Sequence, residues 1–377
     1  MPAASLIHWT EAGAACSALW RSEAALPPPR RVVIADDSIS ADAAYRLACE
    51  GTAMLWRGDF QNARQLLLAL ARRCDRSAQG KKRAAAAVPP DAFHRHRLAR
   101  SQRARTLGML LLPFAADFTL PLRRAPDVRL ACQEAYGPGT EAFVASLREL
   151  LGVIGAHEWR KNGVAVPALG ARIHPHYGVF APIRSEYLSL VAAAPLPAVT
   201  LAFDIGTGTG VLAALLARRG VQRIVATDQD PRALACAQDN LERLGLLAQV
   251  EVVPQDLFPP GRAPLVVCNP PWLPARASSS LELAIFDPDS RMLRGFLAGL
   301  AAHLAPAGEG WLILSDLAEH LGLRTRAELL ALIAAGGLTV LERRDVRPDH
   351  PKVGDAGDAL HAARAAEVTS LWRLAAQ

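Results

Sequence analysis

Short apolar runs alternate with helix-like stretches from Val199 to the C-terminus, and this alternation constrains the fold more than any other feature of the sequence. Seven runs have the length and composition of buried strands, at residues 199–206, 223–228, 250–255, 264–269, 310–315, 338–346 and 368–375. Amphipathic stretches of helical spacing lie between most of them. Strands that alternate with helices predict an α/β fold with a mostly parallel seven-stranded sheet covered on both faces.

The N-terminal part of the chain follows a different, mixed pattern. It contains one short strand candidate at 32–35 and several helical stretches, including one at 141–155 that we expect Gly155 to end. A length of 377 residues favours two domains over one. We therefore expect a mixed α/β substrate-recognition domain over residues 1–160 and a second domain over 165–377, joined by a Gly-, Pro- and His-rich connector.

The positive charge of the chain is concentrated in one segment. The formal net charge is +6, and residues 81–105 hold eight Lys or Arg side chains against one Asp. Such a segment is either a solvated charged helix or loop, or a surface that faces RNA or another acidic partner. Both interpretations stay open at the level of the sequence.

The cysteines and the apolar runs indicate in which cellular compartment the protein is found. None of the six cysteines forms a CxxC pair or a Cys/His cluster with zinc spacing, so we expect reduced thiols and no metal site. The N-terminus lacks the pattern of a secretory signal. The longest apolar run, at 107–118, is too short to span a bilayer. These features predict a cytoplasmic protein without a membrane partner.

A glycine-rich turn follows the first strand of the regular region, in the sequence "DIGTGTG". It contains Asp204, Gly206, Thr207, Gly208 and Gly210. Glycines allow a sharp turn and the close approach of a ligand to the main chain. The third glycine comes one residue too early for the G-x-G-x-x-G pattern of dinucleotide-binding folds, which argues against NAD. An acidic residue just before the turn fits a cationic ligand better than a pyrophosphate.

The next two strands also end in polar residues. The second ends in "TDQD", where the Asp228 carboxylate can accept hydrogen bonds from ribose hydroxyls, and Gln229 follows it. The third leads to "QDLF", where Asp256 can accept from an adenine amino group and Leu257, with Phe258, offers apolar surface. Aspartates at strand ends are often turn formers, but three in succession beside a glycine turn indicate a nucleoside site.

The fourth strand ends in "NPPW", a rigid corner at residues 269–272. The side-chain oxygen of Asn269 and the main-chain carbonyl of Pro270 can both accept N–H bonds from a planar NH₂ group, and Pro271 restricts the backbone between them. Trp272 offers a flat face on which an amide or a base can stack. The alternative is that the two prolines only terminate a strand. Beside the glycine turn, we favour a catalytic corner.

These four motifs, in this order and spacing, resemble those of the class I S-adenosylmethionine-dependent methyltransferases over residues 175–377. The resemblance implies a Rossmann-like domain that transfers a methyl group from S-adenosyl-L-methionine to nitrogen. By that resemblance, the catalytic residues are Asn269, Pro270, Pro271 and Trp272. The residues expected to bind the cofactor are Asp204, Gly206, Thr207, Gly208, Gly210, Asp228, Gln229, Asp256, Leu257 and Asn269.

The sequence indicates the identity of the methyl acceptor less clearly than it indicates methyl transfer. The motifs look most like those of the glutamine methyltransferases of release factors and ribosomal proteins, which implies a glutamine side chain of a translation-related protein as the acceptor. Pro182 matches a segment of that group, but the Arg-Pro pair expected after it reads Ile183-Arg184.

Three alternatives remain open. The two-part architecture resembles the rRNA guanine methyltransferases, which implies a nucleobase amino group of rRNA or tRNA, although those enzymes usually carry Phe where Trp272 stands. The second alternative is an inactive cofactor-binding module that binds RNA or a partner. The third is an enzyme that methylates a small molecule. His174 and His176 suggest a metal site only weakly, because the sequence supplies no third ligand, so we expect a polar linker or a substrate-side loop there.

Overall fold

The computed structural model describes residues 5–82, 91–139, 141–277, 282, 284–348 and 358–377. The chain divides into two compact units, Met1–Glu158 and Trp159–Gln377. Each unit is described by itself below. That the first unit recognises the substrate stays a prediction.

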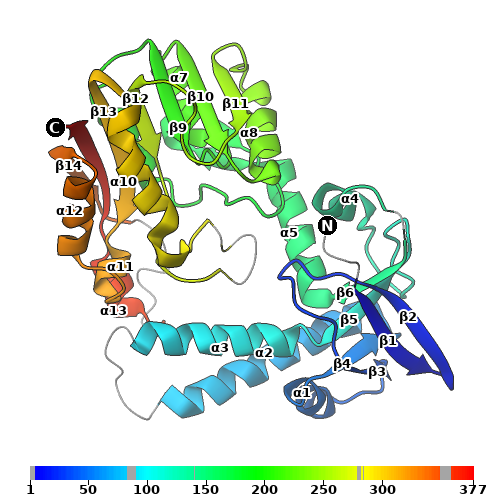
Figure 1. The fold of residues 1–377 in the computed structure, drawn as a ribbon. Helices are drawn as coiled ribbons and strands as arrows, with labels where there is room; N and C mark the ends of the chain where they lie inside the picture. Colours follow the sequence, from blue (N-terminus) through cyan, green and yellow to red (C-terminus); the bar gives the residue numbers. More distant parts are fainter. Residues whose placement is uncertain (1–4, 83–90, 140, 278–281, 283, 349–357) are drawn as a thin grey trace. The chain divides into compact units, whose positions relative to one another are not determined.

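The first unit is built on a six-stranded mixed sheet (Figure 1). Its strands lie in the order β1-β2-β6-β5-β4-β3. β3, β4 and β5 are parallel, whereas β1 with β2 and β5 with β6 are antiparallel. The bounds are Leu6–Glu11 for β1, Ala14–Trp20 for β2, Arg31–Ala35 for β3, Thr52–Trp56 for β4, Leu110–Phe114 for β5 and Phe143–Ser146 for β6.

The expected helix at 141–155 is wrong at both ends. Residues 143–146 form strand β6, and helix α5 (Leu147–Asn162) begins only after them and continues past Gly155. The Ser146 hydroxyl accepts the Glu149 backbone N–H at 3.1 Å, which stabilises the start of the helix. The other helices of this part are α1 (Ala41–Cys49), α2 (Phe60–Lys82), α3 (Asp91–Leu107) and α4 (Arg129–Tyr136).

The basic segment lies largely on helix α3. Arg95, Arg100 and Arg105 are exposed there, and Arg103 forms an ion pair with Asp75 at 2.8 Å. Residues 83–90 of this segment lie outside the described residues. The predicted contact with RNA stays a prediction.

The second unit contains the predicted seven-stranded sheet, whose strands lie in the order β11-β10-β9-β12-β13-β15-β14 (Figure 1). β11, β10, β9, β12 and β13 are parallel to one another, and β15 is antiparallel to both of its neighbours. The predicted Rossmann-like α/β fold is confirmed. The bounds are Leu201–Ile205 for β9, Arg223–Asp228 for β10, Val250–Pro254 for β11, Ala263–Cys268 for β12, Leu304–Ser315 for β13, Leu338–Val346 for β14 and Thr369–Ala376 for β15.

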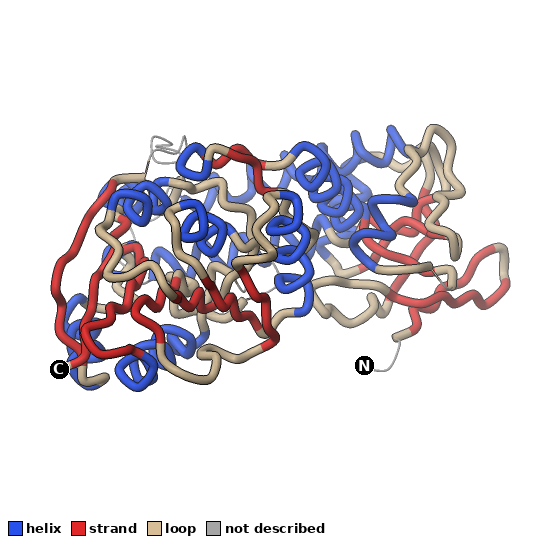
Figure 2. The backbone as a smooth tube through the Cα atoms, turned by 90° about the horizontal axis from the view of Figure 1, so that it is seen from above, coloured by secondary structure: helices blue, strands red, loops and turns tan. Residues whose placement is uncertain are grey.

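Helices cover both faces of this sheet (Figure 2). Alternation along β12 shows why: Leu265 and Val267 join the apolar cluster on one face, and Val266 and Cys268 join the cluster on the other. The first face packs against α6 (Glu186–Ala193), α7 (Val211–Arg218) and α8 (Pro231–Arg243), and the second against α10 (Arg291–His303) and α12 (Arg326–Ala335).

Several short elements complete the second unit. A hairpin of β7 (Val164–Val166) and β8 (Ala171–Ile173) flanks the 3₁₀ turn η1 (Pro167–Leu169). The turn η2 (Pro288–Ser290) precedes α10, while α11 (Leu317–His320) and α13 (His361–Ala366) follow β13 and β14. None of the helices within the described residues is long and apolar enough to cross a membrane.

Candidate functional site

The carboxyl ends of β9, β10, β11 and β12 lie along one edge of the sheet in the second unit. β9 pairs in parallel with β10 on one side and with β12 on the other, so the order of the strands reverses beside β9. In open α/β sheets, ligands bind beyond the carboxyl ends of the strands at such a reversal. The glycine turn follows β9 and the Asn-Pro-Pro-Trp corner follows β12, so these two predicted motifs flank this point.

The glycine turn adopts a backbone that only glycine adopts readily. Gly206, Gly208 and Gly210 have φ values of 72°, 55° and 78°. A Cβ atom on Gly206 would also lie 2.4 Å from Cε of Met292, whereas one on Gly208 would meet nothing within 4 Å. The main chain is therefore tightly packed at the first glycine and open at the second, which is the geometry needed for a ligand to approach it.

Asp204 lies fully buried beneath this turn. Its Oδ2 accepts hydrogen bonds from the Thr207 hydroxyl at 2.7 Å and from the Ala213 backbone N–H at 3.1 Å. Its Oδ1 is also buried, and no residue of the described part of the chain donates a hydrogen bond to it. Burial raises the pKa of Asp204 to about 6, against the opposing effect of those two bonds. The site thus contains a carboxylate oxygen that lacks a donor.

Asp228 ends β10 and holds the glycine turn in place. Its carboxylate accepts the backbone N–H of Gly208 and that of Asp230, each at 3.0 Å. Burial raises the pKa of this half-buried carboxyl group. A carboxylate has about four acceptor positions, so it can still accept from a ligand beside these backbone donors. Gln229, next to it, is exposed.

The third strand end is the most solvated of the four. Asp256 is exposed and forms an ion pair with Arg291. Leu257 has a positive φ of 65°, and its carbonyl accepts the Thr227 hydroxyl at 2.7 Å. The ring of Phe258 stacks on that of His303 with centroids 4.2 Å apart, so it contributes to the packing of α10. Asp256 and Leu257 stand at the predicted strand end, but Asp256 already has a cationic partner.

The Asn-Pro-Pro-Trp corner follows the fully buried Cys268 at the end of β12. Pro270 is buried, and Asn269, Pro271 and Trp272 are half-buried. The indole N–H of Trp272 donates to Oδ1 of Asn269 at 2.9 Å. The predicted acceptor oxygen therefore carries one internal hydrogen bond and keeps one lone pair for a substrate N–H.

Tyr187 on α6 holds the same carboxamide from another side, and sequence reasoning missed it. The side-chain amide of Asn269 donates a hydrogen bond to the Tyr187 hydroxyl oxygen, which opposes the effect of burial on the pKa of that group. The tyrosine is 6% exposed, and burial raises the pKa of its hydroxyl group well above the usual range. A neutral phenol and an indole N–H together fix the orientation of the asparagine. The sequence contains no spacing signal that links residue 187 to residue 269.

Arg184, at the position where the sequence departs from the expected Arg-Pro pair, lies over the ring of Trp272. The guanidinium carbon is 5.1 Å from a ring centroid, and Arg184 also forms ion pairs with Glu367 and Glu186, each at 3.0 Å. Glu367 is 2% exposed. This cation covers the indole and fixes it through a buried carboxylate.

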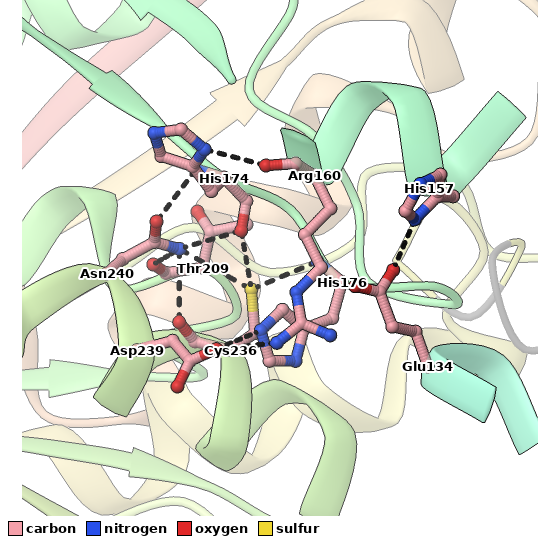
Figure 3. A network of polar contacts seen from close by, with 9 residues as sticks. All are labelled: Glu134, His157, Arg160, His174, His176, Thr209, Cys236, Asp239 and Asn240. Atoms are coloured by element: carbon pink, nitrogen blue, oxygen red, sulfur yellow. Dashed lines mark hydrogen bonds and ion pairs between the residues drawn. The ribbon is translucent and has the colours of Figure 1, made fainter. Parts of the chain in front are cut away.

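The two histidines of the connector bind other parts of the chain (Figure 3). Nδ1 of His174 lies 2.7 Å from the carbonyl oxygen of Arg160, and Nε2 of His176 lies 2.7 Å from Oδ2 of Asp239. Within the part of the chain that the structure describes, no group of three His, Cys, Asp or Glu side chains is placed to hold a metal ion. Both histidines therefore have hydrogen-bond partners within the second unit, and their expected role stays a prediction.

Asn240 of α8 connects this connector to the glycine turn (Figure 3). Its side-chain oxygen accepts the His174 backbone N–H at 2.7 Å, and its amide donates to the Thr209 carbonyl at 3.1 Å. It is 1% exposed. The sequence contains a signal for it, because Asn240 follows Ala233 and Cys236 on the buried face of an amphipathic helix, where a polar residue requires internal partners.

Comparison with known proteins gives one family match and several relatives. A family model described as "Methyltransferase small domain" matches residues 170–321. A release factor glutamine methyltransferase of Cereibacter sphaeroides is 32% identical over 180 residues, which cover 44% of this chain and 61% of the relative. A ribosomal protein L11 methyltransferase of Pelotomaculum thermopropionicum is 38% identical over 144 residues, which cover 37% of this chain and 39% of the relative.

These matches are partial. The aligned residues span less than two thirds of either of these relatives. Among solved structures, a methyltransferase from Pyrococcus furiosus is 19% identical, with a TM-score of 0.41, and the match covers 59% of this chain and 98% of that one.

Proposed function

We propose that this chain, which contains a methyltransferase domain over residues 170–321, transfers a methyl group from S-adenosyl-L-methionine to the side-chain amide nitrogen of a glutamine in a translation-related protein. The family match confirms the predicted methyltransferase resemblance and, with it, the predicted cofactor. The observation that carries the rest of the proposal is the corner at Asn269, which lies beside the glycine turn at the reversal of the strand order.

The residues at the strand ends fit this cofactor. The orphaned Oδ1 of the buried Asp204 suits a ligand that carries positive charge and N–H groups. The open main chain at Gly208 admits a ligand beside it, and Asp228 retains acceptor positions for hydroxyl groups. Asp204, Gly206, Thr207, Gly208, Gly210, Asp228, Gln229, Asp256, Leu257 and Asn269 are our proposed cofactor-binding residues. When bound, S-adenosyl-L-methionine supplies the activated methyl carbon.

The task of the chain is then to hold a weak nucleophile. An amide nitrogen is a poor nucleophile because its lone pair is delocalised into the carbonyl group. The remaining lone pair of Asn269 Oδ1 and the carbonyl of Pro270 are our proposed acceptors for the two N–H groups, which fixes the nitrogen and stabilises positive charge as it develops there. Tyr187 and Trp272 hold the asparagine in one orientation, and the prolines fix the backbone.

The names of the relatives support a protein substrate. One of the two relatives above is named a release factor glutamine methyltransferase, and the other a ribosomal protein L11 methyltransferase. A second candidate is an amino group of a base in rRNA or tRNA. The exposed Arg95, Arg100 and Arg105 on α3 support this candidate, because clustered arginines neutralise phosphates. Glutamine amides and nucleobase amino groups are both planar, so the corner alone does not separate them.

One labelling experiment decides between the two candidates. The purified protein is incubated with tritiated S-adenosylmethionine and an extract from cells that lack it, and the product is then treated with protease or ribonuclease. We expect macromolecular label that protease destroys and ribonuclease spares. Label that only ribonuclease removes would establish the RNA candidate, and the absence of macromolecular label would contradict both.

A further inference from the structure

A buried arginine of the second unit lacks the carboxylate that such a residue normally has. Arg324 follows α11 and is 6% exposed. Its Nε and Nη2 atoms are buried, and neither has a hydrogen-bond partner among the residues that the structure describes. Burial of a cation without a counter-ion costs several kcal/mol, so this arrangement requires an explanation.

The two free atoms form one functional edge. The Nε and Nη2 N–H groups of an arginine point the same way and match the two oxygens of a carboxylate. This chain uses that edge repeatedly. Arg57 binds Glu11 through it at 2.8 and 2.6 Å, and Arg373 binds Glu309 through it at 2.8 and 2.6 Å. In Arg324 the same edge is buried, and it has no acceptor among the residues that the structure describes.

The acidic side chains near Arg324 are engaged elsewhere. Asp287, Glu319 and Glu328 are the carboxylates whose charge acts on it, yet burial still lowers the pKa of its guanidinium group. Glu319 forms an ion pair with Arg326 at 2.8 Å. Glu328 is part of the capping box at the start of α12. Thus these three carboxylates act on Arg324 through their charge, and no acceptor for its Nε and Nη2 lies among the described residues.

The Asp287 carboxylate is also engaged. It accepts the backbone N–H groups of Met292 and Leu293 at 3.0 and 3.1 Å, which cap the start of α10. Its own backbone N–H donates to the carbonyl of Leu273 at 2.8 Å. Leu273 directly follows Trp272. The third carboxylate near Arg324 therefore belongs to the segment that packs against the proposed catalytic corner.

Arg324 belongs to the same edge of the sheet as that corner. β13 runs parallel to β12, with Leu312 opposite Cys268, and ends at Ser315. α11 follows, and the backbone N–H of Arg324 donates to the carbonyl of Ala318 in it at 3.4 Å. Arg324 therefore stands beyond the carboxyl ends of β12 and β13, on the far side of β12 from the glycine turn.

We propose that Arg324 is the receptor for a carboxylate group of the methyl acceptor. This inference rests on the proposed function for its assignment to the acceptor, and it adds a specificity to it. The acceptor carries an acidic group close to the nitrogen that is methylated, and that group completes the bidentate pair that the chain leaves open.

Small carboxylates test the receptor directly. Thermal unfolding is followed in sodium acetate, acetamide, inorganic phosphate and sodium chloride at equal ionic strength. We expect acetate well above its dissociation constant to raise the melting temperature by on the order of 2 °C over chloride, and acetamide to have no effect. In Arg324→Met this response is lost. Arg324→Lys keeps the charge without the planar edge and also loses it. A wild-type response to phosphate but not to acetate would overturn the proposal.

The stability of the ligand-free protein gives a second readout with a matched control. Arg324→Met removes a buried charge that has no partner, so we expect a higher melting temperature without ligand. Arg373→Met is the control, because it leaves the buried Glu309 without its cation and is expected to lower the melting temperature. An Arg324→Met protein that melts lower than wild type and still responds to acetate would show that Arg324 is structural.

The cofactor also carries a carboxylate, and calorimetry separates the two sources. We expect Arg324→Met to bind S-adenosylhomocysteine as wild type does and to need on the order of tenfold more extract for half-maximal label transfer. Weakened S-adenosylhomocysteine binding would assign Arg324 to the cofactor and overturn the proposal. A wild-type protein that binds no S-adenosylhomocysteine would contradict the proposed function instead, whatever acetate does.

Discussion

Both sheets of the molecule end parallel strands in aspartates, but the buried Asp59 of the first unit has a cationic partner, whereas the buried Asp204 of the second has none among the described residues. In the first unit, Asp37 follows β3 and Asp59 follows β4. Arg124 binds Oδ2 of Asp59 at 2.6 Å, and Arg123 binds Asp37 at 3.3 Å. In the second unit, Asp204 has no cation among its described partners, and one of its oxygens has no donor. A carboxylate at a strand end is therefore not by itself a sign of a site.

The pKa values of these two aspartates shift in opposite directions, because only Asp59 has a cationic partner. The guanidinium group of Arg124 lowers the pKa of Asp59, whereas burial raises the pKa of Asp204 to about 6. Within the described residues, the buried polar side chains of the first unit are Thr52 and Asp59, and the many others belong to the second unit. Buried polar groups cost free energy unless they are paired, and among the described residues the buried Oδ1 of Asp204 is such an unpaired group.

The largest expected effect is on the corner after β12. Asn269→Ala removes the proposed acceptor of the substrate N–H, and we expect methyl transfer to fall by at least about 10²-fold, as for the loss of one group that stabilises developing charge. Cofactor affinity should change far less than the rate, because Asn269 is only one of the proposed cofactor contacts. The rate is measured by transfer of tritiated methyl groups. Asn62→Ala, which removes a surface amide bound to Asp37 of the first unit, is the control and should keep full activity. Normal turnover by Asn269→Ala would make the corner structural.

The next effect is the dependence of stability on pH. The folded pKa of Asp204 is about 6 and lies above the usual value of 3.8, so the folded state binds the proton more tightly than the unfolded state. Between about pH 4 and 6, rising pH therefore destabilises the protein through this group, by up to about 3 kcal/mol for a shift of roughly two units. Urea unfolding of wild type and Asp204→Asn should show a difference that declines over this range.

For Asp59 of the first unit, we expect stability to depend on pH in the opposite direction. Its folded pKa is lowered, so its contribution is present above pH 3.8 and is lost as the pH falls through the lower folded value. The difference between wild type and Asp59→Asn should therefore rise with pH. If both stability differences change with pH in the same direction, the contrast between the unpaired Asp204 and the paired Asp59 is contradicted.

The next, smaller effect is on cofactor affinity, which should depend on an aspartate of the second unit and not on one of the first. Asp228→Ala removes acceptors for hydroxyl groups and loosens the glycine turn at Gly208, and we expect affinity for S-adenosylmethionine to weaken by roughly 1.5–3 kcal/mol. Titration calorimetry measures this change. Asp37→Ala in the first unit is the matched control and should bind the cofactor unchanged. Equal affinities for all three proteins would remove Asp228 from the site.

The smallest effect concerns Tyr187, which positions Asn269. Tyr187→Phe removes one hydrogen bond to the carboxamide, worth about 1 kcal/mol, so we expect kcat to fall roughly fivefold with KM and cofactor affinity unchanged. Tyr136→Phe in the first unit removes a comparable bond to Glu149 and should leave kcat alone. A rise in KM without a fall in kcat would show that Tyr187 does not act through Asn269.

The difference between the units also explains what the sequence could reveal. In the second unit, short buried strands alternate with capped helices, so the strand ends and their polar residues were predictable from periodicity alone. The mixed sheet of the first unit was not. Residues 143–146 were mistaken for the start of a helix, because a four-residue strand is too short to show alternation against the helical pattern after it.

The contacts within the site were less predictable than its residues. Asn240 was recognisable as a polar residue on a buried helical face, but its partners are brought together only by the fold. Tyr187 comes from a segment whose sequence gives no sign of the corner that it approaches, and the sequence around Arg324 gives no sign of its unpaired guanidinium edge. Satisfaction of hydrogen bonds is a property of the folded chain, so an open acceptor or donor becomes visible only in the structure.

The most direct test of the account is a crystal structure with S-adenosylhomocysteine. We predict that the ligand lies across the carboxyl ends of β9, β10 and β12, with its hydroxyl groups on Asp228 and its sulfur atom facing Asn269. A ligand bound at another place, or side chains of the chain itself filling the space above Gly208, would contradict the central claim.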